Sequence, residues 1–130
     1  MKTSKYVKHV DAFDNKFGNV LTGKIAKAYL GIKNMNIKRK EIEKFKTNRK
    51  YDIIYSFAIH HWIPLEFEDY IKKLKSLSKK EGIIFLESHN LNNKDKDFEK
   101  KKKIIKKYFE INREIDMKHD GNRICLVLKN

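Results

Sequence analysis

Two apolar runs in the middle of the chain each end abruptly in polar, chemically capable side chains. The first covers residues 51–57 and leads to residues 60–62 (His-His-Trp), and the second covers residues 83–86 and leads to residues 87–90 (Glu-Ser-His-Asn). Short apolar runs without alternation are typical of parallel strands buried on both faces, and the carboxyl ends of such strands open into a ligand crevice. The pattern therefore predicts an α/β domain of the kind found in enzymes.

The N-terminal part of the chain predicts a strand, a helix and a second strand. Residues 6–13 alternate in polarity as a half-buried strand does, and the polar residues after them break the strand. The spacing over residues 20–30 predicts a helix capped by Gly31, and residues 35–38 predict a short strand. The apolar residues expected on the buried face of this helix are Leu21, Ile25, Ala28 and Tyr29.

The C-terminal part continues the alternation of strands and helices. Pro64 marks the start of a helix, and Asp120-Gly121 is a strong signal for a hairpin turn. The helix that follows Pro64 is expected to bury Tyr70, Ile71, Leu74 and Leu77. The expected order is loop 41–45, strand 51–57, helix 65–78, strand 83–86, a lysine-rich helix, strand 111–117 and strand 123–128.

The bulk properties predict a single small domain spanning residues 1–130. A hydrophobic content of 40% is enough for a modest core. No apolar run approaches the roughly 20 residues that cross a bilayer, and the start of the chain lacks the apolar segment of a secretory signal. The lone Cys125 lies in an apolar alternation and is expected to pack as a small hydrophobic residue. We therefore expect a soluble, cytoplasmic protein.

The net charge of +14 would ordinarily point to nucleic acid or an anionic surface. Here the excess is almost all lysine, spread along the whole chain, and arginine, the better reader of bases, occurs at only four positions. The dense lysine run at residues 100–103 lies among apolar residues at helical spacing, so we interpret it as the solvated face of an amphipathic helix, with a phosphate-binding strip as the alternative. Nucleic acid is therefore not the expected partner.

Several segments resemble motifs of the class I S-adenosylmethionine-dependent methyltransferases. Residues 51–56 (Tyr-Asp-Ile-Ile-Tyr-Ser) resemble that family's fourth strand, and residues 10–15 resemble its second. Residues 74–87 resemble its helix, leader-lysine-proline-glycine-glycine turn and fifth strand, with Glu81-Gly82 in place of the usual Pro-Gly-Gly. The polar ends at residues 60–62 and 87–90 are most similar to bacterial enzymes of a generic methyltransferase-domain group, some of them associated with surface-polysaccharide synthesis. The resemblance implies a Rossmann-like, three-layer α/β sheet that ends in an antiparallel hairpin.

The resemblance covers essentially all 130 residues but begins only at the family's second strand. In that family the strand order is 3-2-1-4-5-7-6, and the first strand carries a glycine-rich turn that wraps the methionine end of the cofactor. Nothing before Tyr6 matches this strand. The resemblance therefore implies an incomplete sheet with the first strand absent. We expect a truncated methyltransferase whose unpaired strand edges close up or receive a strand from a second chain.

The resemblance implies that S-adenosylmethionine is bound by Asp14, Asn15, Glu41, Ile42 and Ser56. Asp14 is expected to accept hydrogen bonds from the ribose hydroxyls, with a turn-forming role beside Asn15 as the alternative. Glu41 and Ile42 are expected to frame the adenine, unless Glu41 is a solvated loop acid. Ser56 ends a strand, and its small side chain lets the backbone approach a ligand. Alternatively, the Ser56 hydroxyl is simply satisfied at the strand end.

The catalytic candidates are His60, His61 and His89. Methyl transfer from a sulfonium is an in-line displacement, so the protein mainly positions the reactants, and an imidazole that titrates near pH 6.5 suits a base for a hydroxyl acceptor. A structural hydrogen bond is the alternative role for either of the first two. Trp62 is interpreted as packing on the following helix, with a stacking platform for the acceptor as the alternative. Two histidines with a carboxylate such as Glu87 also suggest a metal, but their spacing matches no recognised signature, so no metal is expected.

Three functions of different classes follow from these observations. The first is a methyltransferase domain acting on a small-molecule or sugar acceptor, a choice of acceptor that rests on the resemblance alone. The second is a non-catalytic truncated remnant, or half of a split enzyme. The third is a basic RNA-binding module, whose binding would depend strongly on salt if lysine charge alone carried it.

Overall fold

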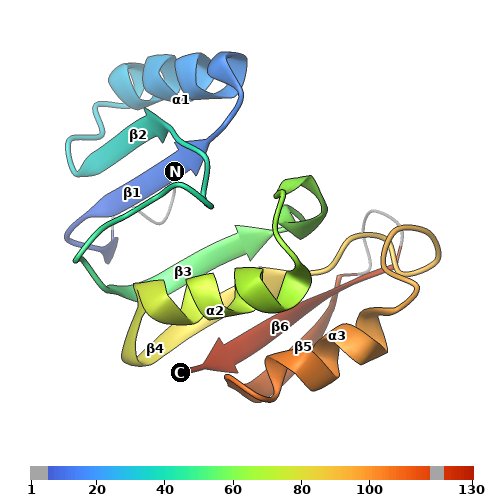
Figure 1. Ribbon diagram of the computed structural model, residues 1–130. Coiled ribbons are helices and arrows are strands. Elements are labelled where there is room, and N and C mark those ends of the chain that lie inside the picture. Colours follow the sequence, from blue (N-terminus) through green and yellow to red (C-terminus); the bar gives the residue numbers. More distant parts are fainter. Residues whose placement is uncertain (1–5, 118–121) are drawn as a thin grey trace. The chain divides into compact units, whose positions relative to one another are not determined.

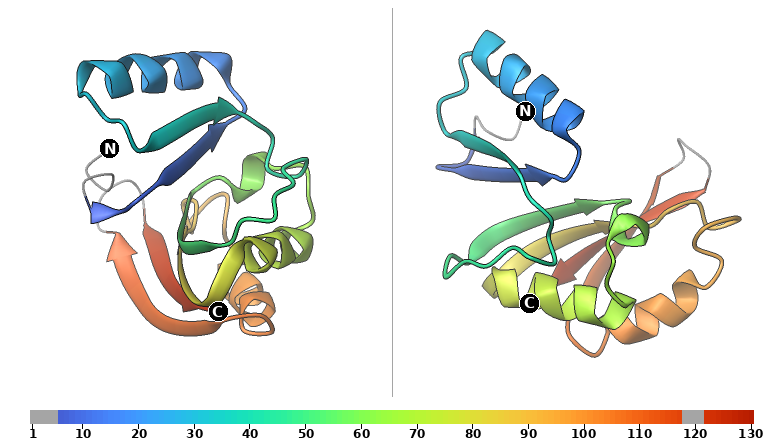
Figure 2. Two further views of the ribbon diagram at one scale, coloured as in Figure 1. Left: turned by 90° about the vertical axis from the view of Figure 1, so that its left-hand side faces the viewer. Right: turned by 45° about the horizontal axis from the view of Figure 1, so that its top comes forward.

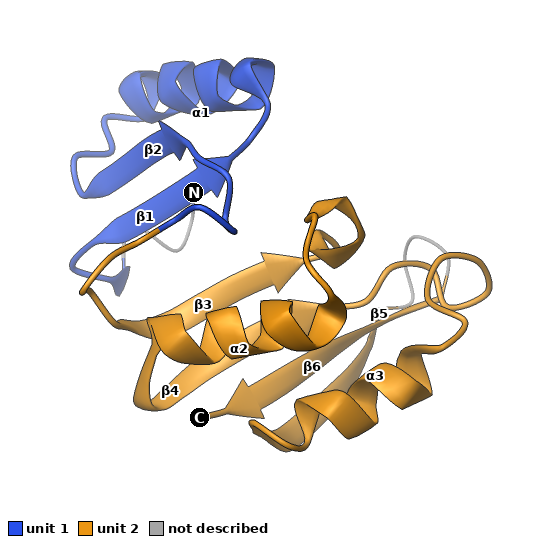
Figure 3. Cartoon of the chain, in the orientation of Figure 1, with its two compact units in different colours: residues 1–45 blue, residues 46–130 orange. Residues whose placement is uncertain are grey.

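Figure 1 shows a computed structural model of the chain, which describes residues 6–117 and 122–130. The predicted hairpin turn at Asp120-Gly121 lies outside the described residues. The chain divides into two compact units, residues 1–45 and residues 46–130 (Figure 3). Each unit has its own sheet, so the two are described separately.

The first unit is a parallel strand–helix–strand motif. It contains β1 (Val10–Asp14), α1 (Phe17–Tyr29) and β2 (Met35–Arg39), with Val10 opposite Met35 and Asp14 opposite Arg39. The helix begins three residues earlier than predicted because the Asp14 carboxylate receives the backbone N–H of Lys16, which completes the turn within two residues. The helix ends at Tyr29, one residue before the predicted end, and Gly31 has the predicted left-handed conformation at φ 61°.

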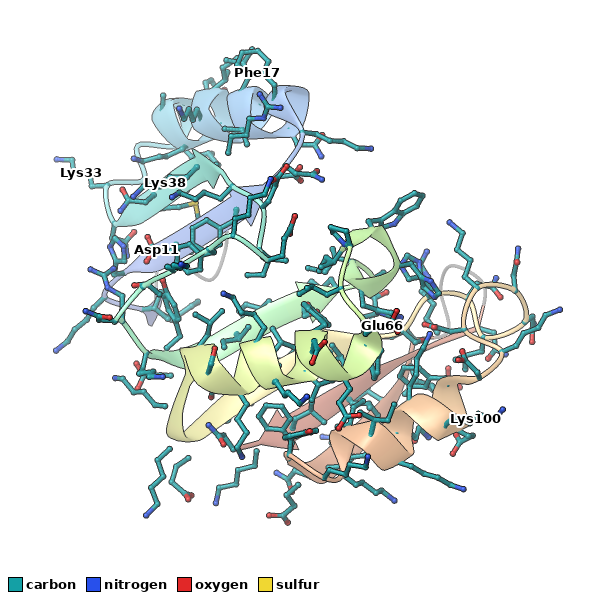
Figure 4. The ribbon with its side chains drawn as sticks, viewed as in Figure 1. Asp11, Phe17, Lys33, Lys38, Glu66 and Lys100 are labelled. Carbon is teal, nitrogen blue, oxygen red and sulfur yellow. The ribbon has the colours of Figure 1, made fainter. Side chains whose placement is uncertain are left out.

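The apolar stripe of α1 is exposed, so the prediction that it is buried is wrong. Phe17 is 64% exposed and Tyr29 is 90% exposed, and the residues between them at four-residue spacing, Leu21 and Ile25, are exposed too. Phe17 projects from the side of α1 that faces away from β1 and β2 (Figure 4). Instead, the helix contacts its own sheet through the adjacent face, where Val20 is buried.

In its described residues, the second unit has a four-stranded sheet, two α-helices and a short 3₁₀ turn. The strand order is β3-β4-β6-β5, in which β3 and β4 are parallel and β6 runs antiparallel to both of its neighbours. Its elements are β3 (Tyr51–Phe57), η2 (His60–Trp62), α2 (Phe67–Leu77), β4 (Ser78–Glu87), α3 (Phe98–Ile105), β5 (Glu110–Met117) and β6 (Arg123–Lys129).

This topology confirms the predicted α/β class and its terminal antiparallel hairpin. The order β3-β4-β6-β5 is the one that the resemblance implied for the family's fourth, fifth, seventh and sixth strands, and β1 beside β2 matches its second and third. Within the described part of the chain, β1 pairs only with β2, and β3 pairs only with β4. One edge of β1 and one edge of β3 are therefore without a strand partner there, as expected for a sheet that lacks its first strand.

The core of the second unit lies between the sheet and its two helices. Helices α2 and α3 cover the same face of the sheet (Figures 1 and 2). The predicted stripe of α2 is confirmed, since all four of its residues are buried, and Cys125 is also buried as predicted. Burying an aliphatic side chain of this kind stabilises the fold by about 1.5–3 kcal/mol. The fully buried aliphatic residues that meet in this layer are Ile71, Ile84, Leu86, Ile105, Leu126 and Leu128.

Strand β4 starts at Ser78, five residues earlier than predicted, because Tyr51 at the start of β3 pairs with Ser78. Gly82 lies within this extension, where a Cβ atom would come 2.9 Å from the carbonyl oxygen of Lys79. Only glycine fits this close approach without a shift of the backbone.

The lysine run of α3 is not a uniformly solvated face, which corrects the sequence-based interpretation. Lys101 and Lys102 are buried, and each pairs with acidic residues. Lys102 contacts Glu114 at 2.7 Å and Glu99 at 2.9 Å. These two charges are used inside the fold, so they are not available to a phosphate backbone. No helix of the described chain has the length and apolar composition that a membrane span requires.

Candidate functional site

The predicted site residues fall into two groups, one in each unit. Asp14, Asn15, Glu41 and Ile42 belong to the first unit, and Ser56, His60, His61 and His89 belong to the second. Each group gathers at the carboxyl ends of parallel strands, where a ligand crevice is expected in an open α/β sheet. The geometry of each group is described within its own unit.

Asp14 lies at the carboxyl end of β1 and borders a pocket of about 310 Å³. Its Oδ1 accepts the backbone N–H of Lys16 at 2.7 Å, and its Oδ2 accepts the side-chain amide of Asn19 at 2.9 Å. The turn-forming role is therefore present. It does not exhaust the carboxylate, because each oxygen has a further lone pair that can accept a hydroxyl.

The other predicted residues of this group follow the neighbouring strand end. The backbone N–H of Lys40 donates to the carbonyl oxygen of Asp14 at 3.1 Å, so Glu41 and Ile42 come directly after the point where β1 and β2 separate. Glu41 is exposed and pairs with Lys44, as a solvated loop acid does. The carbonyl oxygen of Asn15 accepts from Arg39 Nε at 3.0 Å, which ties the two strand ends together.

Ser56 is buried at the end of β3, and its hydroxyl lies 2.6 Å from the hydroxyl of Tyr70 on α2. Burial raises the pKa of Tyr70 to about 12, against the opposing effect of the hydrogen bond with Ser56. The hydroxyl is therefore satisfied inside the core, as the alternative interpretation held. The predicted approach of a ligand to the backbone at Ser56 stays a prediction.

The three catalytic candidates come together, as predicted, from two different strand ends. His60 and His61 lie on the 3₁₀ turn after β3, and His89 lies just after β4. The ring centre of His61 is 4.7 Å from that of His60 and 4.7 Å from that of His89, and the centres of His60 and His89 are 5.2 Å apart. The carboxyl ends of two adjacent strands thus place three imidazoles in mutual contact.

A fourth residue, Asp95, holds this cluster together and was not predicted. The Nε2–H groups of His60 and His61 donate to its Oδ1 at 3.1 Å and 2.9 Å, and its Oδ2 accepts the backbone N–H of His89 at 2.6 Å. Lys101 Nζ on α3 is 2.5 Å from the same Oδ1. The sequence holds no signal for this role, because Asp95 lies in a run of alternating lysine and aspartate that reads as a polar loop.

The charges of the cluster are set by burial and by these contacts. The Asp95 side chain is fully buried, which by itself would raise its pKa, but the hydrogen bonds from His60 and Lys101 outweigh burial and hold the pKa well below its usual range. Burial, together with the proximity of His60 and His61, lowers the pKa of His89 to about 4. At neutral pH the cluster therefore contains an ionised Asp95 and a neutral His89.

Access to the cluster differs among its members. The His61 side chain is 31% exposed, whereas the His60 side chain is 3% exposed. Within residues 6–117 and 122–130, two buried ring nitrogens have no hydrogen-bond partner, His60 Nδ1 and His89 Nε2. His61 is thus the member that a substrate can reach.

Two neighbouring residues differ from their predicted roles. Trp62 is 66% exposed, so its predicted packing on the following helix is wrong, and instead its ring lies 4.4 Å from Lys94 Nζ and 6.4 Å from the ring of His89. Glu87 pairs with Arg123 at 3.1 Å. The carboxylate beside the histidines is therefore Asp95 and not Glu87.

The sequence matches no protein-family model and no curated protein. Solved structures are similar to the chain at low identity. The N-methyltransferase NodS from Bradyrhizobium japonicum WM9 has a TM-score of 0.82 and 12% identity, over 99% of this chain and 77% of that chain. Its complex with S-adenosyl-L-homocysteine has a TM-score of 0.77 and 12% identity, over 99% and 70% of the two chains. A SAM-dependent methyltransferase from Aquifex aeolicus has a TM-score of 0.77 and 17% identity, over 98% and 73%.

Proposed function

Because the chain has the fold of S-adenosylmethionine-dependent methyltransferases, we propose that it is a methyltransferase domain acting on a hydroxyl group of a sugar or other small acceptor. The observation that carries this proposal is the position of Asp14, a carboxylate with free lone pairs at a strand end beside a pocket. One of the similar structures holds S-adenosyl-L-homocysteine, the product that remains after such a methyl transfer.

In the proposed cofactor site, Asp14 binds the ribose of S-adenosylmethionine. An ionised carboxylate accepts two vicinal hydroxyls with strong, short hydrogen bonds. Its hydrogen bonds from Lys16 and Asn19 hold the carboxylate in one orientation before the ligand arrives. Asn15, Glu41 and Ile42 lie at the same edge and are proposed to border the adenosine. S-adenosylmethionine supplies the methyl group on its positively charged sulfur.

In the proposed acceptor site, His61 removes the proton of the acceptor hydroxyl. Its Nε2–H is donated to Asp95, which leaves the lone pair on Nδ1 as the basic position. The buried, ionised Asp95 stabilises the imidazolium that forms when His61 takes the proton. Lys101 on α3 in turn pairs with the Asp95 carboxylate and holds it in place. A hydroxyl acceptor is favoured over an amine. A base activates a hydroxyl by removing its proton, whereas a neutral amine already has a nucleophilic lone pair.

The remaining strand edges of β1 and β3 suit a further strand, from a second chain or another segment. On one side, each has no strand partner in the described residues, as at the edge of a sheet. The alternative of a non-catalytic remnant predicts that no cofactor binds, so cofactor binding separates the two.

Cofactor binding is expected to depend on Asp14. We expect the purified chain to bind S-adenosylmethionine and S-adenosyl-L-homocysteine with micromolar affinity in a calorimetric titration. Asp14→Ala is expected to weaken binding roughly 10- to 150-fold, because hydrogen bonds to a charged group contribute about 1.5–3 kcal/mol. Asp14→Asn keeps an acceptor for the Lys16 N–H, so it tests the charge separately from the turn.

The matched control is Asp69→Ala, which removes an exposed carboxylate from α2 in the other unit. This variant should bind as the wild type does. If the folded wild-type chain binds neither compound, the free-standing enzyme is contradicted and the remnant or split-enzyme interpretation takes its place.

Methyl transfer is expected to depend on His61. In a screen of sugars and small hydroxyl compounds, with S-adenosyl-L-homocysteine formation as the readout, His61→Ala should lower the rate about 100-fold, as loss of a general base typically does. Its cofactor affinity should stay that of the wild type. His9→Ala, which removes an exposed histidine from the first unit, is the control and should leave the rate unchanged. Equal rates for His61→Ala and the wild type would contradict the base role.

A further inference from the structure

The histidine cluster offers more ligand atoms than proton transfer requires. One ring nitrogen of His60, one of His61 and a carboxylate oxygen of Asp95 all lie within 4.8 Å of one another. The third imidazole, His89, is buried in ring contact with the other two, and its Nε2 has no partner among the residues described. A buried ring nitrogen without a partner is unfavourable, and an ion bound to its lone pair would satisfy it.

The spacing of these groups is that of ligands around one ion. With Zn–N bonds of about 2.0–2.1 Å at tetrahedral angles, neighbouring ligand atoms lie roughly 3.3 Å apart and the centres of two bound imidazoles roughly 5 Å apart. Here Asp95 Oδ1 is 3.1 Å from His60 Nε2 and 2.9 Å from His61 Nε2. The three ring centres are separated by 4.7, 4.7 and 5.2 Å. His60, His61 and Asp95 thus have the spacing of three ligands. The fourth, His89, contacts both histidine rings and has to turn its Nε2 toward them when the ion binds.

We propose that His60, His61, His89 and Asp95 bind a divalent transition-metal ion, with Zn²⁺ as the best match. Three neutral imidazole nitrogens and one carboxylate oxygen form a ligand set that suits Zn²⁺ and does not suit Mg²⁺ or Ca²⁺, which prefer oxygen ligands. Because all four positions come from the protein, the ion has no open position for a substrate.

Lys101 is the competitor for this site. Its ammonium lies 2.5 Å from Asp95 Oδ1 and supplies the positive charge that an ion would otherwise supply. It has a second carboxylate partner, Asp97, at 3.3 Å. When an ion binds, Lys101 keeps this second partner, so its displacement from Asp95 does not leave it unpaired. The affinity for metal is therefore set by a competition between two cations for one oxygen.

Metal binding and the base role of His61 exclude each other. An imidazole bound to metal through Nε2 carries its proton on Nδ1, so it has no lone pair left to accept one. The metal-bound form is therefore inactive toward a hydroxyl acceptor. The metal proposal itself does not depend on the proposed function, because binding is measured without cofactor or acceptor.

The test is a calorimetric titration of the tag-free chain with Zn²⁺ in a non-chelating buffer, followed by absorption spectroscopy with Co²⁺. We expect one ion per chain, micromolar or tighter affinity, and the visible absorption bands of tetrahedral Co²⁺. His89→Ala should lower the affinity at least tenfold, since even changes outside the ligand set alter metal affinity 10- to 100-fold. His61→Ala, at the more exposed ligand, is a second variant in case the first does not fold.

Two further variants separate this site from binding elsewhere. Lys101→Met should raise the affinity severalfold, because it removes the competing cation while keeping the aliphatic part of the side chain. His9→Ala should bind as the wild type does, because His9 is exposed and lies in the other unit. The proposal is overturned if the folded wild-type chain does not bind Zn²⁺, if the His89 and His61 variants bind as tightly as the wild type, or if Lys101→Met weakens binding.

Discussion

Replacing Asp95 by alanine is expected to lower the free energy of unfolding by about 3–5 kcal/mol, the usual effect of removing one partner from a buried ion pair. The fully buried carboxylate receives hydrogen bonds from His60, His61 and the backbone of His89, and it pairs with Lys101. Without it, the N–H groups of His60 and of the His89 backbone lose their acceptor in a place that water does not readily reach. The ammonium of Lys101 would keep only Asp97.

Urea denaturation followed by circular dichroism measures this effect, and Asp95→Asn is the matched variant. The asparagine keeps the shape and one acceptor oxygen, so its effect should be smaller than that of alanine. The double-mutant cycle of Asp95→Asn with Lys101→Met should give a coupling free energy of about 0.5–3 kcal/mol, as residues in one ion-pair network do. A loss below about 1 kcal/mol for Asp95→Ala would show that the cluster is solvated and that Asp95 does not organise it.

Replacing Ile84 by alanine is expected to lower the free energy of unfolding by about 2–5 kcal/mol, the range for truncating a buried isoleucine. Ile84 lies on β4, next to its partners Ile54 on β3 and Leu128 on β6, and it is fully buried beneath the helices. Its loss leaves a cavity between the sheet and the buried face of α2. The same denaturation experiment measures the change.

The neighbouring Ile83 provides a control of the same residue type on the same strand. Its side chain points to the opposite face of the sheet and is 39% exposed. Ile83→Ala should therefore change the free energy of unfolding by about 1 kcal/mol or less. If the two substitutions have equal effects, both faces of β4 are equally buried in solution, which contradicts the exposed face described here.

The elements of the second unit were predictable because their signals are local. Residues 51–57 form β3 as predicted, since a run of apolar and β-branched side chains favours a strand wherever it is placed. The stripe of α2 was also correct, because four apolar residues at helical spacing have one common face. The convergence of His60 and His61 with His89 followed from the same logic, since adjacent parallel strands present their carboxyl ends together.

The features that were missed depend on what lies opposite each residue. The stripe of α1 has the same periodicity as that of α2, yet it is exposed, because a periodic pattern shows that a helix has an apolar face and not that anything covers it. Lys101 and Lys102 looked like solvent-exposed lysines. They are buried because carboxylates from outside the helix supply opposite charges. Asp95 in the preceding loop pairs with Lys101, and Glu114 on β5 pairs with Lys102.

The sequence alone determined the α/β class, the order of most strands and helices, and the three histidines at the ends of β3 and β4, because hydrophobic periodicity and strand-end position are properties of short segments. Only the tertiary structure decided that Asp95 joins these histidines, that Lys101 neutralises the cluster, and that Ile83 and Ile84 face different surroundings. These facts arise when the chain brings a loop, a helix and two strand ends within hydrogen-bond distance, and no local pattern encodes which distant partners will meet.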